Sequence, residues 1–303
     1  MSNLLTICGF AFMINVFLHF YIKSFQGICS TDYWEEIFTY DESKKPITRK
    51  EVLLAGTVRN SQPYLIIGIP TVYRIYNDTP AVYITKTLES LITPLTDQDK
   101  KTVQIIIFIA DENPIRRRYL YELIKNNFEK ELWEGLINII GAPRRFYLPL
   151  NNIPVTLGDS KERVYWRSKQ CLDYVFMFDY IHNQSKYYMH IEDDVVAKSE
   201  YYEIVKHKIS FSDIQRESLL PWNQKKVLIK EAWVVKNFYI SGFIGCLIPS
   251  TYLQTMAAFI KILYYEAPVD LIYPQLIDLM KIKIEQHESL FTHIGFQSSS
   301  LGT

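Results

Sequence analysis

Three consecutive acidic residues follow an apolar stretch in the middle of the chain. The segment Tyr187–Val196 reads YYMHIEDDVV, which places Glu192, Asp193 and Asp194 where a buried strand would end. Like charges this close repel one another unless a cation lies among them. Mg²⁺ and Mn²⁺ take oxygen ligands and bridge to phosphates. The pattern therefore indicates either a metal site for the diphosphate of a nucleotide-sugar or a solvated acidic turn.

A second dense group of charged residues precedes that segment. Asp159 or Ser160 is suited to cap a helix that would carry Arg163 and Arg167 four residues apart on one face. Two arginines in this arrangement can hold a diphosphate or a glycan. The alternative is a solvated charged face without a ligand, and the sequence of this helix leaves both interpretations open.

His293 is the third feature that could take part in chemistry. It lies in the segment LFTHIGF, and a histidine there is either a metal ligand or a core residue. The sequence contains no P-loop, GxGxxG, HExxH or G-x-S-x-G element. Because a glycine-rich phosphate-binding loop is absent from the sequence, a metal ion must hold the phosphates if a nucleotide binds.

The elements that would position these residues alternate between strand-like and helical stretches. Continuous apolar runs predict buried strands at 64–70, 103–110, 136–140 and 187–192, with a further strand at 232–247. Helical spacing of apolar residues predicts helices at 81–95, 119–133, 161–179 and 253–265, and another near residue 199. This alternation is typical of βαβ units, so we expect an α/β fold with a mostly parallel sheet.

Three of the predicted strands end in polar residues at the same edge of this sheet. Thr71 and Arg74 follow the first strand, Asp111 follows the second, and Glu192 begins the acidic triplet after the fourth. Ligands of parallel sheets bind at the carboxyl ends of the strands. The convergence of these ends favours the metal-site interpretation over a plain turn.

Length and composition fit a folded globular protein. The chain has 303 residues, of which 48% are hydrophobic and 22% charged, and its formal net charge is zero. Such values are ordinary for folded domains. A chain without a basic field has no long-range attraction for nucleic acid, so we expect no nucleic-acid partner.

The first residues predict a membrane anchor. Leu4–Ile22 carries no charged side chain and is long enough to span a hydrocarbon core. A cleaved signal peptide is the alternative, although the segment lacks a basic start and a good cleavage site. We expect the uncleaved anchor, with a short cytoplasmic tail at 1–3, a transmembrane signal-anchor at 4–22, a stem at 23–60 and one domain over 61–303.

Cysteines and glycosylation sequons bear on the cellular compartment. Cys171 and Cys246 are the two cysteines of the predicted domain, and the sequence allows either a disulfide between them or two buried thiols. Asn77 and Asn183 begin sequons, which are used only in the secretory pathway. Pro80 directly follows the first sequon, so we expect poor use of Asn77.

Five segments occur in an order that resembles a known family. They are Gly68–Val72, Gly158–Tyr174, Glu192–Asp194, Gly242–Gly245 and Leu290–Gly295. Over residues 60–302 the chain resembles the N-acetylglucosaminyltransferase IV family, glycosyltransferase family 54. The resemblance implies a single-pass type II Golgi membrane protein with a luminal GT-A-type, Rossmann-like domain that binds a nucleotide-sugar.

The activity of this family implies a cofactor and a set of site residues. Its members transfer GlcNAc from UDP-GlcNAc, in β1,4 linkage, to mannose of N-glycans on glycoproteins, with a divalent metal such as Mn²⁺ or Mg²⁺. By resemblance, Asp194 and His293 are the metal ligands. The expected donor-binding residues are Thr71, Arg74, Asp111, Arg163, Arg167, Glu192, Asp193 and Gly242.

The chain departs from the family pattern where a catalytic acid is expected. Family members carry an acid in the strand before the Gly-Phe-Ile-Gly loop, and Asn237 occupies that position here. Asparagine cannot act as a base. A second expected acid aligns with Pro274, so Asp270 is the nearest carboxylate that can serve as general base. Two hypotheses follow: a GlcNAc-transferase of N-glycan processing, or an inactive relative that binds and modulates other Golgi N-acetylglucosaminyltransferases.

Overall fold

The computed structural model describes residues 36–37, 46–218, 234–240 and 242–295. Residues Ile37–Thr303 form one compact unit. The predicted membrane anchor at 4–22 lies outside the described residues, as does most of the predicted stem. In the part of the chain that the structure describes, no helix is long and apolar enough to cross a membrane.

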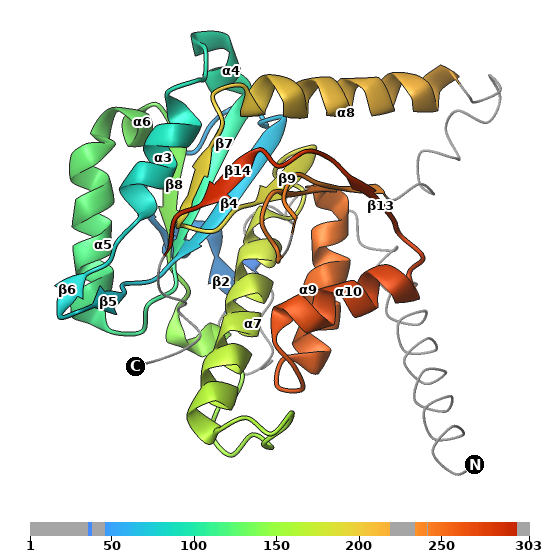
Figure 1. Cartoon of the computed structure of the whole chain (residues 1–303). Helices are drawn as coiled ribbons and strands as arrows, with labels where there is room; N and C mark the ends of the chain where they lie inside the picture. The colour runs from blue at the N-terminus through green and yellow to red at the C-terminus, as the bar shows by residue number, and fades with distance from the viewer. Residues whose placement is uncertain (1–35, 38–45, 219–233, 241, 296–303) are drawn as a thin grey trace, which may run out of the picture. The chain divides into compact units, whose positions relative to one another are not determined.

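An eight-stranded sheet forms the centre of the compact unit (Figure 1). Its order is β13-β11-β12-β9-β4-β7-β8-β3, and β12 and β3 run against the other strands. The strands are β3 (Leu53–Ala55), β4 (Leu65–Thr71), β7 (Val103–Ile109), β8 (Ile137–Ile140), β9 (Tyr187–His190), β11 (Val234–Asn237), β12 (Cys246–Pro249) and β13 (Lys283–Gln286). The predicted α/β fold with a mostly parallel sheet is confirmed.

Helices connect the strands, and the remaining elements are short. The main helices are α3 (Ile84–Ile92), α4 (Asp97–Thr102), α5 (Pro114–Asn127), α6 (Glu129–Trp133), α7 (Lys161–Ile181), α8 (Tyr201–Ser218), α9 (Leu253–Leu263) and α10 (Val269–Leu279). The shorter elements are β1 (Glu36–Ile37), β2 (Ile47–Thr48), α2 (Arg49–Val52), β5 (Ile75–Tyr76), β6 (Thr79–Pro80), η2 (Arg144–Phe146), β10 (Val195–Ala197), η4 (Ser250–Tyr252) and β14 (Phe291–His293).

Both faces of the sheet are covered by helices. On β4, Leu65, Ile67 and Ile69 join the hydrophobic core to which α3 and α5 contribute. On the opposite face, Phe108 of β7 packs against Phe176 of α7, with ring centroids 5.0 Å apart. Figure 1 shows α3, α5 and α6 on one side of the sheet and α7, α9 and α10 on the other. Because neither face meets water, the central strands are continuous apolar runs in the sequence.

The predicted single strand at 232–247 is wrong. The described residues of this stretch belong to two strands, β11 and β12. These strands pair antiparallel, and Asn237 of β11 lies opposite Cys246 of β12. Gly242 and Gly245, in the connection, have φ of +70° and +62°. Glycine adopts this left-handed conformation without steric cost, and it ends a strand.

Two helix predictions also change at their boundaries. The predicted helix at 119–133 is two helices, α5 and α6, which meet at Phe128. The first begins earlier, at Pro114, because the Asn113 side chain accepts hydrogen bonds from the first backbone N–H groups of the helix. The helix α10 is not predicted from the sequence, and it contains Pro274, a residue that normally ends a helix.

Gly68 allows the ring of Tyr188 to lie against β4. A Cβ at this position would be 2.5 Å from Cε2 of Tyr188. We expect Gly68→Ala to lower the free energy of unfolding by about 1–3 kcal/mol, because a packed interior resists an added methyl group. Urea unfolding measures the loss, and Lys86→Ala at an exposed position of α3 is the control. A loss no larger than that of the control would contradict the close contact.

Candidate metal centre

The acidic triplet follows β9 at the carboxyl end of the parallel strands. The N–H of Ile191 donates to the carbonyl of Gly68 at 3.1 Å, which extends the pairing of β9 with β4. The chain then turns into β10, which pairs antiparallel with β14. In this register Val195 lies opposite His293. The strand β14 thereby brings a histidine from a distant part of the sequence next to the triplet.

Glu192, Asp194 and His293 form a cluster suited to a metal ion. Each offers one ligand atom, and these atoms lie within 4.8 Å of one another. Nε2 of His293 is 3.3 Å from Oδ2 of Asp194. Oδ1 of Asp194 is buried and has no hydrogen-bond partner among the described residues. A buried oxygen without a partner destabilises the protein, and a cation in the cluster would satisfy it.

The charges of the cluster also favour a cation. Burial, together with repulsion from Asp194, Asp270 and Asp193, raises the pKa of Glu192 to about 8. Burial and the charge of Asp193 also raise the pKa of Asp194, against the opposing effect of Arg74. A bound cation would hold both carboxylates in the ionised form. Two carboxylates and an imidazole form a donor set that Mn²⁺ accepts, so the residues present fit a divalent metal.

Gly295 lets the C-terminal segment approach the triplet closely. A Cβ on Gly295 would lie 2.1 Å from Oδ2 of Asp194. The N–H of Ile294 donates to the carbonyl of Asp194 at 2.8 Å, which fixes this approach. Any side chain at position 295 would therefore displace the carboxylate that faces His293. The sequence points to Gly295 only as part of a motif, and the structure supplies the physical reason.

Asp193 is engaged by the protein itself. Its carboxylate accepts hydrogen bonds from both terminal nitrogens of Arg74, at 2.8 and 2.9 Å, and from the hydroxyl of Thr71 at 2.6 Å. Its carbonyl accepts a hydrogen bond from the hydroxyl of Thr87, on α3, at 2.7 Å. The side chains of Arg74 and Asp193 are only 11% and 2% exposed. These bonds tie the turn after β9 to the end of β4 and to α3.

Three of the predicted donor-binding residues are thus partners of one another. Thr71, Arg74 and Asp193 come from two strand ends, and the structure brings them together as the sequence predicts. Their contact with a donor stays a prediction. The sequence gives no sign that Thr87 joins them, because nothing in the pattern of α3 marks a threonine whose hydroxyl leaves its own helix.

The two arginines of α7 share one carboxylate. Nε of Arg163 and Nε of Arg167 each lie 3.0 Å from an oxygen of Asp159. The side chain of Arg167 is 1% exposed and also donates to the hydroxyl oxygen of Thr156, whereas that of Arg163 is 42% exposed. The alternative of a solvated face is therefore wrong for Arg167. A contact of either arginine with a diphosphate or a glycan stays a prediction.

Asp111 and Gly242 lie in loops that leave strand ends. Asp111 accepts hydrogen bonds from the backbone N–H groups of Tyr73, at 3.1 Å, and Asn113, at 2.9 Å. These bonds link the loop after β7 to the loop after β4. Gly242 is exposed, and a Cβ there would meet no atom within 4 Å. The role of both residues in donor binding stays a prediction.

The two positions considered for a general base belong to different elements. Asn237 ends β11, and its carbonyl accepts a hydrogen bond from the N–H of His287 at 2.9 Å. Asp270 is exposed in the first turn of α10. Its charge contributes to the raised pKa of Glu192, after burial and Asp194, so it lies within electrostatic range of the cluster. A catalytic role for Asp270 stays a prediction.

An aromatic group that the sequence does not predict supports the triplet. His190, at the end of β9, is fully buried, and its Nδ1 is 2.7 Å from the hydroxyl of Tyr188. Its ring centroid lies 4.8 Å from those of Tyr174 and Phe243. Burial lowers the pKa of His190 to about 3, so the imidazole is neutral. Because Phe243 belongs to the β11–β12 connection, this contact joins that connection to the strand that carries the triplet.

The structure decides between the two alternatives for the cysteines and shows where the two sequons lie. Cys171 and Cys246 are both buried free thiols, so the disulfide alternative is wrong. Asn77 and Asn183 are both exposed, with φ of 47° and 59°. Their glycosylation stays a prediction.

Most of the chain is similar in sequence to one family of known proteins. The model of the family described as "MGAT4 conserved region" matches residues 31–303. The chain is 32% identical over 254 residues to alpha-1,3-mannosyl-glycoprotein 4-beta-N-acetylglucosaminyltransferase A of Xenopus tropicalis and of Bos taurus, covering 78% of this chain and 44% of each relative. It is also 32% identical to the B enzyme of Mus musculus, of which it covers 43%. The chain thus spans less than half the length of the curated relatives it matches.

Solved structures with a similar arrangement are distant in sequence. One is 4-diphosphocytidyl-2C-methyl-D-erythritol synthase from Anaerococcus prevotii, with a TM-score of 0.40, 11% identity and coverage of 79% of this chain and 94% of that one. Another is S. aureus TarS in complex with UDP-GlcNAc, with a TM-score of 0.36, 10% identity and coverage of 78% and 60%. Likenesses this distant say nothing about ligand or activity.

The buried pair of Arg74 and Asp193 is testable by a double-mutant cycle. Arg74→Met leaves the carboxylate of Asp193 buried without its ionic partner, so we expect the free energy of unfolding to fall by about 3–5 kcal/mol. Asp193→Leu in the same background removes that charge, and the double variant should lose less than the sum of the two single variants. Urea unfolding of the four proteins measures the coupling.

An exposed pair supplies the matched control for this cycle. Lys130 and Glu134 lie 3.8 Å apart on the surface, and we expect their coupling to stay below about 0.5 kcal/mol. Additive losses at Arg74 and Asp193, like those expected for the control pair, would show that the buried pair does not hold the triplet in place.

Proposed function

The chain belongs to the MGAT4 family, and from this membership we propose that it transfers GlcNAc from UDP-GlcNAc, in β1,4 linkage, to core mannose of N-linked glycans. The relatives that it matches carry this class of activity in their names. The observation that supports the proposal within the chain is the cluster of Glu192, Asp194 and His293, in which a buried carboxylate oxygen has no hydrogen-bond partner in the part of the chain that the structure describes. A site of this composition suits the metal-bound diphosphate of a nucleotide-sugar.

In this proposal, different residues of the chain would bind the metal ion and accept the proton. Glu192, Asp194 and His293 would hold Mn²⁺ or Mg²⁺, which as a Lewis acid neutralises the charge of a departing diphosphate. Arg74, through Asp193, fixes the turn that presents two of these ligands. The carboxylate of Asp270 would accept the proton of the acceptor hydroxyl as general base. Its exposure in the first turn of α10 leaves it open to an acceptor.

The proposed location is the Golgi membrane, with the domain in the lumen. The uncharged segment Leu4–Ile22 supports a single-pass type II anchor. The exposed sequon residue Asn183 fits a luminal domain that is itself glycosylated. A glycoprotein acceptor, which occurs in this compartment, is then the partner in the reaction.

A second function is favoured by one residue, Asn237. It ends β11, where a family member would carry an acid, and its neutral amide cannot accept a proton. The metal cluster draws on other elements and would remain intact in such a protein. The chain would then bind a nucleotide-sugar without transfer and act by binding and modulating other Golgi N-acetylglucosaminyltransferases.

Metal binding is measured apart from activity by thermal unfolding. We expect Mn²⁺ to stabilise the protein by about 2.7 kcal/mol at a hundredfold excess over its Kd, because only the folded protein has the site. Asp194→Asn should abolish this stabilisation, whereas Asp97→Asn, at an exposed acid of α4, should keep it. A wild-type protein that responds to neither Mn²⁺ nor Mg²⁺ would contradict the metal site.

Transfer is tested with UDP-GlcNAc, Mn²⁺ and a biantennary N-glycan. If the chain is an enzyme, wild type forms product and Asp270→Asn lowers the rate by about 10²–10⁴-fold, the usual contribution of a general base. Activity of the wild type rules out the non-catalytic function. No activity in wild type and Asn237→Gln, with product formed by Asn237→Glu, rules out the enzyme and supports the modulator.

A further inference from the structure

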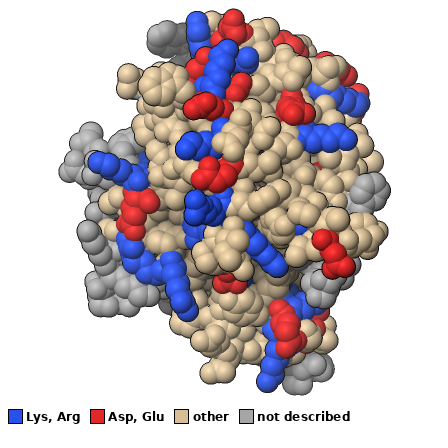
Figure 2. All heavy atoms as spheres, turned by 90° about the vertical axis from the view of Figure 1, so that its left-hand side faces the viewer, with Lys and Arg blue, Asp and Glu red and all other residues tan. Residues whose placement is uncertain are grey.

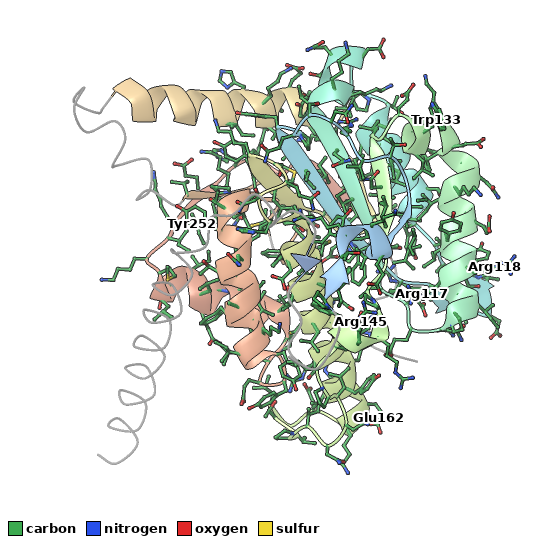
Figure 3. The ribbon with its side chains drawn as sticks, turned by 180° about the vertical axis from the view of Figure 1, so that it is seen from behind. Arg117, Arg118, Trp133, Arg145, Glu162 and Tyr252 are labelled. Atoms are coloured by element: carbon green, nitrogen blue, oxygen red, sulfur yellow. The ribbon has the colours of Figure 1, made fainter. Side chains whose placement is uncertain are left out.

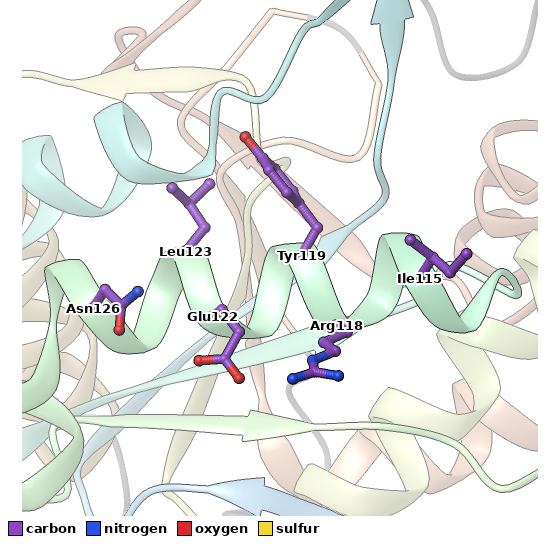
Figure 4. A pocket seen from close by; sticks show the side chains of 6 residues that line it. All are labelled: Ile115, Arg118, Tyr119, Glu122, Leu123 and Asn126. Atoms are coloured by element: carbon purple, nitrogen blue, oxygen red, sulfur yellow. The ribbon is translucent and has the colours of Figure 1, made fainter.

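The outer side of α5 carries two parallel rows of side chains with a hollow between them. One row is apolar and the other polar, and in each row successive members are four positions apart: Ile115, Tyr119 and Leu123, and Arg118, Glu122 and Asn126. The hollow that they line has a volume of about 420 Å³ (Figure 4). Rows at this spacing are the ridges, and the space between them the groove, of helix-to-helix packing.

The core of the domain accounts for only part of this apolar row, because Leu123 is half-buried and packs against it. Leu120 and Ile124 are the residues of α5 that are buried against the sheet. Ile115 and Tyr119, which point elsewhere, are 79% and 44% exposed. Single exposed apolar residues are common. A row along one helix, bordered by charges, is the pattern of a face that meets another helix.

The central residue of the apolar row is held in position before any partner binds. The ring of Tyr73 meets that of Tyr119 edge to face, with centroids 5.1 Å apart. The guanidinium of Arg116 lies 5.6 Å from the centroid of the Tyr73 ring. An aromatic side chain fixed in this way loses little conformational entropy on binding, which favours its use as an anchor in an interface.

The charges of the polar row are complementary to those of a second copy of the same helix that runs in the opposite direction. Arg118 is positive and Glu122, one turn later, is negative, and neither forms an ion pair with another residue that the structure describes. Figure 3 shows Arg118 on the outer side of α5. A second copy of the helix, turned end for end, would place its glutamate against this arginine and its arginine against this glutamate.

We propose that α5 is the contact surface of a homodimer, in which two copies of the helix pack antiparallel about a twofold axis. Tyr119 lies near the axis, and Ile115 of each copy meets Leu123 of the other. Arg118 of each copy pairs with Glu122 of the other. Closed homodimers use the same patch on both copies. The midpoint of Ile115 and Leu123 and that of Arg118 and Glu122 fall at adjacent positions of α5, as that symmetry requires. The proposal does not rest on the proposed function.

Charge on the surrounding surface favours this partner over an anionic one. Figure 2 looks onto the side of the molecule that carries α3, α5 and α6, and basic and acidic side chains are intermixed there. A surface for nucleic acid or an anionic membrane would gather one sign of charge. Mixed charges bordering an apolar row fit a protein surface with the same mixture, and a second copy has it by necessity.

Sedimentation of the full chain of 303 residues, in a non-ionic detergent, tests the dimer. We expect wild type to dimerise with an affinity that weakens as salt is added. Arg118→Glu and Glu122→Arg should each raise the dimer Kd by at least about tenfold, because the twofold axis turns two attractive pairs into two repulsive pairs. Lys86→Glu, on α3, is the control and should leave the Kd unchanged.

Mixing the two charge variants gives the decisive test of the proposed pairing. An equimolar mixture of Arg118→Glu and Glu122→Arg restores opposite charges at both contacts, so it should form the dimer that neither variant forms alone. Melting temperatures of the separate variants establish that each is folded. A monomeric wild type, a dimer indifferent to both variants, or a mixture that stays monomeric would overturn the proposal.

Discussion

The buried ion pair between Asp193 and Arg74 joins the segments that end at the rim of the sheet. A charge pair removed from water stabilises a fold only when each partner keeps its hydrogen bonds. Here both carboxylate oxygens accept bonds from the guanidinium, and Thr71 adds another. Because an unpaired charge at this depth is unfavourable, the turn after β9 is held in one conformation, and its neighbours are presented in a fixed way.

The two acids on either side of Asp193, unlike Asp193 itself, are not neutralised by a buried ion pair with any arginine that the structure describes. Glu192 and Asp194 have pKa values raised first by burial and then by nearby acids, and a buried oxygen of Asp194 has no partner among the described residues. His293 reaches them through the pairing of β14 with β10, and Gly295 leaves room for the approach. Adjacent residues of one turn thus divide between holding the fold and offering ligands.

The proposed metal cluster and the positions considered for a general base belong to separate parts of the molecule. The cluster is formed by the turn after β9 and by β14, whereas the positions considered for a base lie on β11 and α10. A substitution at Asn237 therefore removes no carboxylate from the cluster. The outer side of α5 contributes no residue to either group, although Tyr119 meets the ring of Tyr73 in the loop after β4.

The sequence by itself determined the alternation of strands and helices, the triplet at a strand end and the resemblance that proved to be family membership. Buried parallel strands are apolar throughout, so their pattern is visible locally. Only the tertiary structure decided which acid of the triplet pairs with an arginine, because Arg74 lies 119 positions from Asp193. It also divided the stretch 232–247 into two strands, since an apolar pattern does not reveal the left-handed backbone of Gly242 and Gly245.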